Sequence, residues 1–500
     1  MRSKNQRLLG VALFIITGTI AIASGSVPSH MDTELLAVPR TWDDAALSTA
    51  ELPLSFASAS PIYVGADYYY RIPERTIYKT YPIYAPAKEP PGYMSMLEQQ
   101  DPQTDFDPSA LKSDEDWARA GEAIFDTPVF ITPIADVGNP EWYEKTGMPI
   151  ARDGTIPFAR YVVRQKGRVE LGIGSCATCH TRVMPDGSII KGAQGNVPID
   201  RVLAFTYRAR LGSDVVHFGE RIRYVAPWLG ADDPGTKIQK MSRDEIASLH
   251  EAIPPGVQAR HSTSPFYPVQ VPDLIGVKDR HFFDRTGMFL HRSIGDLMRY
   301  AALVQGLDVL ARYGDFRLVD DVPDPKRFLR YSDAQLYALA IYLYSLKPPV
   351  NPNRFDADAR QGETIFKREG CGVCHTPPLY TNNKLTLAVG FKAPADHLSK
   401  YDILPISVGT DPNLALKTRK GTGYYKVPSL KGVWYRGPFE HDGSVATLED
   451  WFDPHRLNED YAPTGFRGYG VRTRAVPGHR FGLDLSRDER RQLIAFLRTL

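Results

Sequence analysis

The feature that most constrains this chain is a pair of Cys-x-x-Cys-His motifs. They lie at Cys176-Ala177-Thr178-Cys179-His180 and Cys371-Gly372-Val373-Cys374-His375, and together they use all four cysteines. Two thiols at this spacing can bond the two vinyl groups of a c-type haem, and the histidine that follows can then reach the iron. We therefore predict two covalently attached c haems, with His180 and His375 as the proximal iron ligands.

Other uses of these cysteines are less consistent with the pattern. Exported proteins commonly pair cysteines in disulfides, but a disulfide needs no histidine directly after each pair. A zinc site would need its Cys and His ligands to meet in one tetrahedron, and a redox Cys-x-x-Cys pair does not require the histidine either. The recurrence of the complete motif favours haem attachment.

Length and charge narrow the class of protein further. With 500 residues, 43% of them hydrophobic, the chain can bury the cores of two or three domains. Its 60 Lys and Arg residues against 58 Asp and Glu leave a formal charge of +2, which gives no global attraction to nucleic acid or to an anionic membrane. The 40 prolines and 40 glycines predict long ordered loops.

The first residues, 1–25, have the layout of an export signal. A basic start precedes an uncharged run at residues 8–23, and Ala21-Ile22-Ala23 is a plausible cleavage site. The run is shorter than the roughly 20 residues that span a bilayer, although residues 25–27 could extend it into an uncleaved anchor. We predict an exported or periplasmic protein that contacts a membrane only if this N-terminus is retained.

Internal repeats divide the rest of the chain. The segment Gly121–Phe125 (GEAIF) returns as Gly362–Phe366 (GETIF), each ahead of a haem motif. Residues 271–277 (VPDLIGV) return as 427–433 (VPSLKGV), each after a haem motif. Amphipathic helices are predicted at 332–346 and 486–500, at the end of each copy. These recurrences predict two related units.

We therefore predict a mainly α fold of two cytochrome c-like haem domains with long irregular loops. The first is residues 111–350 (unit 1) and the second is residues 351–500 (unit 2), and the proline-rich segment 347–352 links them. Residues 26–110 are rich in Tyr and Pro and lack helical periodicity. They are predicted to form an extended arm over the haem domains, with a disordered linker as the alternative.

Unit 2 also carries the motifs of a known family. Val427-Pro428-Ser429-Leu430 is followed by Pro438-Phe439-Glu440-His441-Asp442-Gly443 and then by Thr447-Leu448-Glu449. Together with the haem motifs, these segments resemble the bacterial dihaem cytochrome c peroxidase and MauG superfamily, over roughly residues 113–500. The resemblance implies an N-terminal haem (haem 1) that meets the oxidant and a C-terminal haem (haem 2) that relays electrons.

The resemblance also suggests a sixth ligand for haem 2. In that family the ligand lies fourteen residues after the His-Asp-Gly histidine, as methionine in the peroxidases and tyrosine in MauG; here that position is His455. All nine methionines lie at or before Met298, so none is available in unit 2. We predict His455 as the ligand, which would give a lower potential than methionine. The rivals are His397, His479 and Tyr461.

Two further residues take family roles by position. His441 matches the His-Asp-Gly histidine that helps organise the space near haem 2, although a packing histidine in a turn is the alternative. Phe283, in His281-Phe282-Phe283-Asp284-Arg285, replaces the tryptophan that family members place between the haems. Trp228 is a second candidate for a bridging aromatic, against the alternative of an ordinary core tryptophan.

Unit 1 departs from the family pattern around haem 1. No glutamate occurs at residues 298–312, where relatives have an acid/base group, and no histidine occurs at residues 181–216, where the peroxidases have a displaceable ligand. Peroxide turnover is therefore predicted to be slow, because O–O cleavage benefits from a positioned proton carrier. Other histidines could lie on the distal side: His217, His261, His281 and His291.

These features predict a haem-dependent oxidoreductase that is peroxidase-like and uses hydrogen peroxide or dioxygen. Its electron partner would be a small cytochrome c or cupredoxin, and the resemblance leaves open a calcium ion near Pro438. An oxygenase resembling the RoxA-type rubber oxygenases, acting on an organic substrate, is the runner-up. A non-catalytic dihaem electron carrier and a MauG-like maturation factor also fit these features, since one fold hosts several chemistries.

Overall fold

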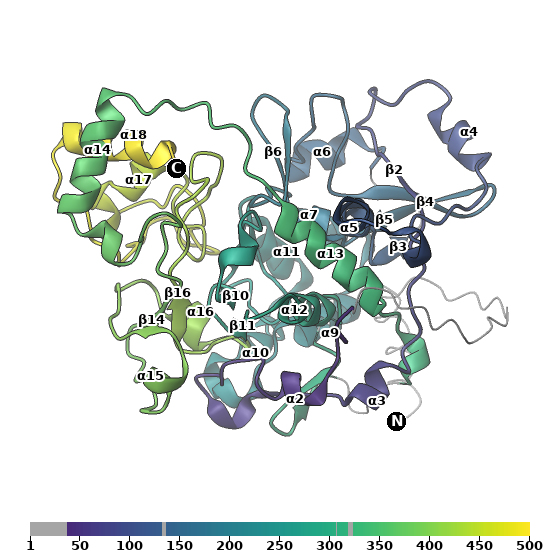
Figure 1. The fold of residues 1–500 in the computed structure, drawn as a ribbon, viewed down its shortest axis with the longest axis horizontal. Helices are drawn as coiled ribbons and strands as arrows, with labels where there is room; N and C mark the ends of the chain where they lie inside the picture. The colour runs from purple at the N-terminus through teal and green to yellow at the C-terminus, as the bar shows by residue number, and fades with distance from the viewer. Residues whose placement is uncertain (1–37, 133–136, 307, 319–323) are drawn as a thin grey trace.

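The computed structural model describes residues 38–132, 137–306, 308–318 and 324–500 (Figure 1). The predicted export signal lies outside these ranges. Within them, no helix is both long and apolar enough to cross a membrane.

The helices of residues 38–350 are mostly short. The α-helices are α2 (Asp44–Leu47), α3 (Ala66–Tyr69), α4 (Tyr93–Glu98), α5 (Asp114–Asp126), α6 (Pro140–Thr146), α7 (Cys176–Cys179), α8 (Ile199–Arg210), α9 (Ser213–Tyr224), α10 (Pro234–Ile238), α11 (Arg243–Glu251), α12 (Ile294–Gly306) and α13 (Asp333–Ser345). The 3-10 turns are η1 (Ala57–Ala59), η2 (Pro108–Ala110), η3 (Pro227–Asp232), η4 (Val277–Asp279) and η5 (Pro325–Arg327).

Unit 2 has fewer helices, and Figure 1 shows it in green to yellow beside unit 1. Its helices are α14 (Ala357–Arg368), α15 (His397–Lys400), α16 (Asn413–Leu416), α17 (Leu448–Trp451) and α18 (Arg487–Arg498), with 3-10 turns η6 (Cys371–Val373) and η7 (Pro454–Leu457).

Small sheets accompany the helices. The largest has the order β2 (Thr80–Tyr81), β4 (Arg160–Gln165), β5 (Arg168–Ile173) and β3 (Phe130–Thr132). Two three-stranded sheets have the orders β1 (Pro61–Tyr63), β12 (Ala311–Tyr313), β13 (Phe316–Arg317) and β15 (Ile403–Leu404), β14 (Leu385–Leu387), β16 (Tyr424–Lys426). The hairpin pairs are β6 (Thr181–Val183) with β7 (Ile189–Lys191), β8 (Val257–Gln258) with β9 (Val269–Gln270), and β10 (Phe282–Phe283) with β11 (Phe289–Leu290).

Each unit is built on one pair of crossing helices, α5 with α13 in unit 1 and α14 with α18 in unit 2. The helices cross closely at a glycine. A Cβ on Gly121 would lie 2.0 Å from the carbonyl oxygen of Ala338, and one on Gly362 would lie 2.0 Å from that of Gln492. These glycines occupy the same place in the repeated pentapeptide. Only glycine permits so close a backbone approach, which explains why both copies carry it.

Capping fixes where three of these helices begin. Ser113, Ser332 and Ser486 each accept a hydrogen bond from a backbone N–H in the first turn, and the third helical residue bonds back to the backbone of the serine. Such a capping box satisfies donors that a helix end otherwise leaves unpaired. The helices predicted at 332–346 and 486–500 are thus present as α13 and α18, each beginning directly after its capping serine.

Residues 38–110 pack along unit 1. Strand β1 pairs with β12 and β2 pairs with β4, both antiparallel. Trp42 is fully buried, its ring stacks on Tyr69 at 4.3 Å, and its Nε1 donates to the carbonyl of Val64 at 2.8 Å. The predicted arm therefore contributes strands and core side chains to unit 1.

The four-stranded sheet goes beyond the predicted mainly α fold. Strands β4 and β5 form a hairpin whose turn places Gly167 at φ +80°. Alternating apolar residues around a Lys-Gly pair are a hairpin pattern, so this sheet was open to prediction from the sequence.

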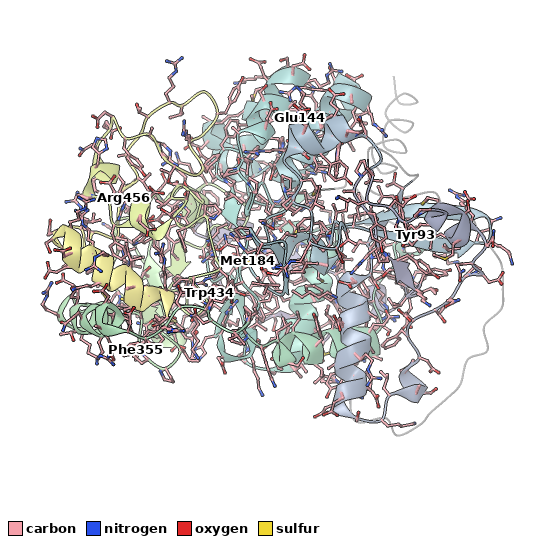
Figure 2. The ribbon with its side chains drawn as sticks, turned by 90° about the horizontal axis from the view of Figure 1, so that it is seen from above. Tyr93, Glu144, Met184, Phe355, Trp434 and Arg456 are labelled. Carbon is pink, nitrogen blue, oxygen red and sulfur yellow. The ribbon has the colours of Figure 1, made fainter. Side chains whose placement is uncertain are left out.

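The two units meet along an apolar junction. Met184 of unit 1 and Trp434 of unit 2, both labelled in Figure 2, pack in one cluster with Ile190, Ala193 and Tyr435. The Tyr435 hydroxyl donates to the Asp273 carboxylate across the junction at 2.8 Å. The haem motifs of both units are thereby held within one packed body.

Candidate haem centres

The haem motif of unit 1 lies on α7 and the residue that follows it. Ser175 caps this turn by accepting a hydrogen bond from the Thr178 N–H at 3.2 Å. His180 Nδ1 lies 3.0 Å from the carbonyl oxygen of Pro272. A histidine held this way presents Nε2 to a metal. Burial lowers the pKa of His180 to about 4, so the ring is neutral at pH 7, as a metal ligand must be.

Unit 2 repeats this arrangement. His375 follows η6, and its Nδ1 lies 3.2 Å from the carbonyl oxygen of Tyr380. The carbonyl of Pro428, which is the counterpart of Pro272 in the repeated segment, also bonds to the ring. Burial, with repulsion from His479, lowers the pKa of His375 to about 4. Both predicted proximal histidines are therefore neutral and are oriented by backbone carbonyls.

An apolar cavity opens beside His375. It holds about 1480 Å³ of atom-free space, part of which is open to solvent. Both cysteines of the motif line it. The rest of the wall is rich in aromatic side chains: Phe366, Phe439, Trp451, Phe452 and Phe481.

Positively charged groups line another part of this cavity. They are Arg285, Lys426 and Arg436. Within the described residues, the Nε atoms of both arginines are buried without a hydrogen-bond partner. Burial, with repulsion from Arg436 and Arg280, lowers the pKa of Arg285 to about 9, and burial lowers the pKa of Lys426 well below its usual value.

This wall fits a haem. Desolvated cations are costly unless anions pair with them, and haem propionates are carboxylates of the kind that arginine binds well. The aromatic side of the cavity suits the apolar porphyrin. Cys371, Cys374 and His375 would then attach the ring and bind its iron, while Arg285 and Arg436 would pair with its propionates.

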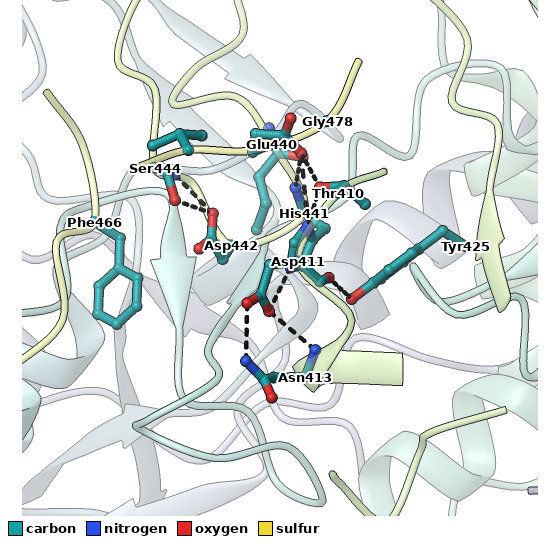
Figure 3. Close-up of polar contacts among 12 residues, drawn as sticks. Thr410, Asp411, Asn413, Tyr425, Glu440, His441, Asp442, Ser444, Phe466 and Gly478 are labelled. Carbon is teal, nitrogen blue, oxygen red and sulfur yellow. Dashed lines mark hydrogen bonds and ion pairs between the residues drawn. The ribbon is translucent and has the colours of Figure 1, made fainter. Parts of the chain in front are cut away.

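His441 lies in the same wall, within a polar cluster (Figure 3). Its ring contacts Tyr425 at a centroid distance of 4.7 Å, and Thr410 Oγ1 lies 3.4 Å from its Nδ1. Carboxylate oxygens of Glu440 and Asp411 lie 3.5 and 3.9 Å from its ring nitrogens. Burial lowers the pKa of His441, but these acids outweigh it and raise the pKa above the usual value. His441 therefore lines the cavity beside His375, and the role that the family resemblance implies for it stays a proposal.

The predicted ligand His455 lies outside this cavity. Its side chain is 49% exposed, and its Nε2 pairs with Asp460 at 3.2 Å. The next residue, Arg456, is fully buried and donates to the carbonyls of Trp451 at 2.9 Å and Val476 at 2.7 Å. The side chain of Arg456, labelled in Figure 2, points into the protein from the η7 turn. The side chain of the neighbouring His455 therefore faces solvent. The structure does not bring His455 to His375.

A different histidine faces His375. His479 lines the cavity, and the centroids of the two imidazole rings are 6.3 Å apart. The other rivals lie outside the cavity. His397 accepts or donates a hydrogen bond at 2.9 Å with the Tyr424 hydroxyl, and Tyr461 packs against His455.

The candidate distal histidines of unit 1 are all bonded to protein groups. His217 bonds to the carbonyls of Ser213 and Met241, His261 to Asp308, His281 to Asp402, and His291 to the carbonyl of Arg280 and the hydroxyl of Tyr344. Each has the partners of a structural histidine. None shows the free ring that His479 shows in unit 2.

Of the two candidate bridging aromatics, Phe283 packs in one cluster with Cys176 and Ala177 of the unit 1 motif. It packs against Tyr300 at a centroid distance of 4.7 Å. The next residue, Asp284, pairs with Arg260. Besides the larger effect of burial, the positive charge of Arg260 acts to lower the pKa values of Cys179 and His180 in the unit 1 motif. The following residue, Arg285, lines the cavity of unit 2. Trp228 instead stacks on Tyr313 at 5.7 Å, outside that cavity.

Two partly buried carboxyl groups, Asp308 of unit 1 and Glu51 of the arm, were not predicted from the sequence. Asp308 lies within residues 298–312, which contain no glutamate, and its carboxylate lies 3.2 Å from His261 Nδ1. Glu51 comes from the arm, where no motif marks it. Its Oε1 accepts a hydrogen bond from the Tyr63 hydroxyl and its Oε2 is buried. Burial, moderated by Lys420, raises the pKa of Glu51 to about 8.

The loop matched to a calcium site is held by protein donors. Arg182 donates to the carbonyl of Gly437 at 3.0 Å, and Gln194 and Gln270 donate to that of Pro438. In the described part of the chain, no group of three or more His, Cys, Asp or Glu side chains is arranged to hold a metal ion. The calcium ion stays a prediction.

Comparison with known proteins covers part of the chain. No family model matches it. It is 32% identical over 145 residues to the methylamine utilization protein MauG of Methylorubrum extorquens, which is 29% of this chain and 35% of MauG. It is 26% identical over 164 residues to the cytochrome-c peroxidase IdrP1 of Denitromonas iodatirespirans, which is 29% of this chain and 40% of the relative.

The alignments thus span little more than a third of these curated relatives. Among solved structures, a hydrazine synthase of Kuenenia stuttgartiensis aligns with 60% of this chain and 92% of its own, at 16% identity and a TM-score of 0.31, which is too low to support a conclusion. The sequence matches to MauG and to a cytochrome-c peroxidase support the predicted superfamily at low identity.

Proposed function

We propose that this chain, a relative of the dihaem cytochrome c peroxidases and MauG, is a haem-dependent oxidoreductase with one c haem in each unit. Hydrogen peroxide or dioxygen would bind in unit 1, and unit 2 would pass electrons between a redox partner and unit 1. The main support is that His180 and His375 are held in the same way, each with Nδ1 on a backbone carbonyl beside two free thiols. A haem iron with an exchangeable position supplies redox chemistry that side chains lack.

The surroundings of the two motifs support this division of roles. In unit 2 a second imidazole, His479, faces the proximal histidine at 6.3 Å between ring centroids. The described histidines of unit 1 other than His180 are engaged with protein partners, so unit 1 offers no comparable ligand. A site without a competing ligand is the one at which a small oxidant can bind.

The arm brings a group suited to donating a proton to unit 1. The Glu51 carboxyl has a pKa near 8, raised mainly by burial, so it is largely protonated at neutral pH and can donate a proton. The Asp308 carboxylate raises this pKa further by repulsion. Glu51 takes the place, in this proposal, of the glutamate that the family motif would have supplied.

Electron entry is proposed at the edge of unit 2. Val373, between the two cysteines of the motif, is 68% exposed. A small cytochrome c or cupredoxin could therefore approach the attached ring at this edge. We also propose that the chain is exported, because residues 1–25 have the layout of a signal.

The test is made on protein produced in a host with c-type haem maturation. A pyridine haemochrome assay should return two haems per chain, and the protein should oxidise a reduced small cytochrome on addition of peroxide or dioxygen. The matched variants are Cys176→Ala/Cys179→Ala and Cys371→Ala/Cys374→Ala, each expected to hold one haem. Two haems per chain with no oxidation of any reduced partner would instead indicate an electron carrier.

A further inference from the structure

We propose that His479, and not His455, supplies the second axial ligand of the haem 2 iron. This inference rests on the proposed attachment of a haem at Cys371 and Cys374 with His375 as the proximal ligand. It assigns the position to a residue that no motif of the family marks.

The first argument is the spacing of the two rings. The centroids of His375 and His479 are 6.3 Å apart, and both residues line the same cavity. An imidazole nitrogen binds a metal at about 2 Å, so two imidazoles on opposite sides of one metal have centroids roughly 6 Å apart. The observed spacing leaves room for one iron between the rings.

The second argument is the lack of any other partner for this ring. Within the described ranges, His479 is the one histidine whose side chain makes neither a hydrogen bond nor an ion pair with another residue, and its Nδ1 is buried without such a partner. Buried polar atoms are normally paired, and an exception calls for an explanation. A metal bound at this nitrogen would satisfy it.

The third argument is the backbone that presents the ring. His479 has φ +43°, a conformation that is uncommon for residues other than glycine. Its N–H donates to the carbonyl of Val408 at 2.7 Å, and Arg456 donates to its carbonyl at 2.9 Å. Such conformations persist where surrounding contacts enforce them, and they cluster at ligand-binding sites. The contacts hold the imidazole at this place.

Packing around the ring completes the arrangement. A Cβ on the preceding Gly478 would lie 2.3 Å from the backbone nitrogen of Thr410. The backbone at residue 478 therefore packs directly against the backbone at residue 410. The ring of His479 contacts Trp451 and Phe481 edge-on at 5.1 and 5.3 Å. His455, in contrast, is half-exposed and already paired with Asp460.

The test compares two glycine variants of the holoprotein, His479→Gly and His455→Gly. In the ferric state, His479→Gly should convert haem 2 from low spin to high spin, and exogenous imidazole should restore the low-spin spectrum. His455→Gly should leave the spin state unchanged. The electron paramagnetic resonance and visible spectra report this without any measurement of turnover.

A second substitution keeps the test valid if the glycine variant is unstable. His479→Met should retain both haems while raising the reduction potential of one of them, because a thioether favours ferrous iron relative to imidazole. If His455→Gly opens haem 2 and His479→Gly does not, the proposal is overturned. A haemochrome assay separates this inference from the proposed function. One haem per chain in the wild type would contradict the proposed function. Two haems per chain together with an unchanged His479→Gly spectrum would contradict only the assignment of His479 as the iron ligand.

Discussion

Ala177 and Thr178, between the two cysteines of unit 1, are 2% and 7% exposed, whereas Val373 at the same place in unit 2 is 68% exposed. The cover over unit 1 is specific, since the Thr178 hydroxyl donates to the carbonyl of Phe158 at 2.6 Å, just before strand β4. The arm and the β2-β4-β5-β3 sheet are additions that unit 2 lacks. The same motif is thus enclosed in one unit and open at the surface in the other.

The chemistry around the two motifs differs as well. Unit 1 holds charged and polar pairs that are largely shielded from solvent, such as the ion pair of Arg260 with Asp284 and the contact of His261 with the Asp308 carboxylate. Unit 2 has an aromatic cavity with cations at one side and a second imidazole. An enclosed site with acids suits proton-dependent chemistry on a small oxidant, and an open edge suits electron exchange with a partner.

The largest expected effect tests the buried charges of unit 1. His250 is fully buried between Asp200 at 2.7 Å and Glu220 at 2.8 Å. His250→Leu should lower the free energy of unfolding by about 3–5 kcal/mol, because it leaves buried carboxylates unpaired. Urea unfolding curves measure it.

A matched substitution in unit 2 should cost less. His397 is buried but bonds only to the neutral Tyr424 hydroxyl, so His397→Leu should cost roughly 1–3 kcal/mol. Equal losses in the two variants would mean that unit 1 does not depend on buried charge more than unit 2 does.

The pH dependence of stability provides the next comparison. Burial opposes the protonation of His250, but Glu220 and Asp200 raise its pKa to about 9, above the unfolded value of about 6.5. The bound proton therefore stabilises the fold below pH 6.5, and this stabilisation is lost as the pH rises through about 9. Burial raises the pKa of Glu51 from 4.5 to about 8, so its contribution is likewise lost as the pH rises across that interval.

Thermal melting of the wild type should accordingly occur at lower temperature as the pH is raised from about 7 to 9. Glu51→Gln, which is neutral at every pH, should flatten this dependence below about pH 8. His455→Gln is a suitable control, since its exposed ring should leave the curve unchanged. A Glu51→Gln curve parallel to the wild type would show that Glu51 is ionised in the fold.

Arg456 offers a smaller and more local test of unit 2. Its guanidinium bonds the carbonyls of Gly478 and His479 at 3.0 and 2.9 Å, so Arg456→Met should loosen the loop without removing the ring. We expect a partial high-spin signal from haem 2 that imidazole suppresses, because unpairing buried acceptors costs roughly 1–3 kcal/mol. The control is Arg498→Met, which loses only a surface pair with Glu449. A wild-type spectrum in Arg456→Met would show that the loop is held by other contacts.

Much of this organisation could be predicted from the sequence, for identifiable reasons. Each Cys-x-x-Cys-His motif is local, so its spacing alone predicts an attached c haem. The repeated pentapeptide indicated two units because Gly121 and Gly362 are required at a helix crossing. The hairpin of β4 and β5 could also be predicted from the sequence, because apolar residues alternate on both sides of Gly167.

The ligand of haem 2 could not be predicted in this way. The spacing of the family motifs predicts only the position of a ligand along the chain. The orientation of the His455 side chain depends on its neighbour Arg456, because the Arg456 guanidinium donates hydrogen bonds to carbonyls twenty and more residues away in the sequence. His479 was named only as a rival ligand, because no family motif marks its position. Glu51 was missed for a similar reason, since only the folded arm brings it to unit 1.

The smallest expected effect concerns the open edge of unit 2. Val373→Glu should change the rate of reduction by a small cytochrome a few-fold and alter its dependence on salt, since a charge at the rim of an interface acts mainly on association. Val350→Glu is a matched control, because Val350 is 94% exposed in the linker. Stopped-flow rates at low ionic strength would detect the difference, and identical rates in the two variants would place electron entry elsewhere.

The contrast between a unit with an open iron position and a unit closed by two imidazoles is tested most directly by electron paramagnetic resonance of the ferric wild-type protein, recorded with and without cyanide. The account predicts one high-spin haem, which cyanide converts to low spin, and one low-spin haem with two imidazole ligands that cyanide leaves unchanged. Two low-spin haems that are both inert to cyanide would contradict it, as would a cyanide-sensitive signal that disappears in Cys371→Ala/Cys374→Ala but persists in Cys176→Ala/Cys179→Ala.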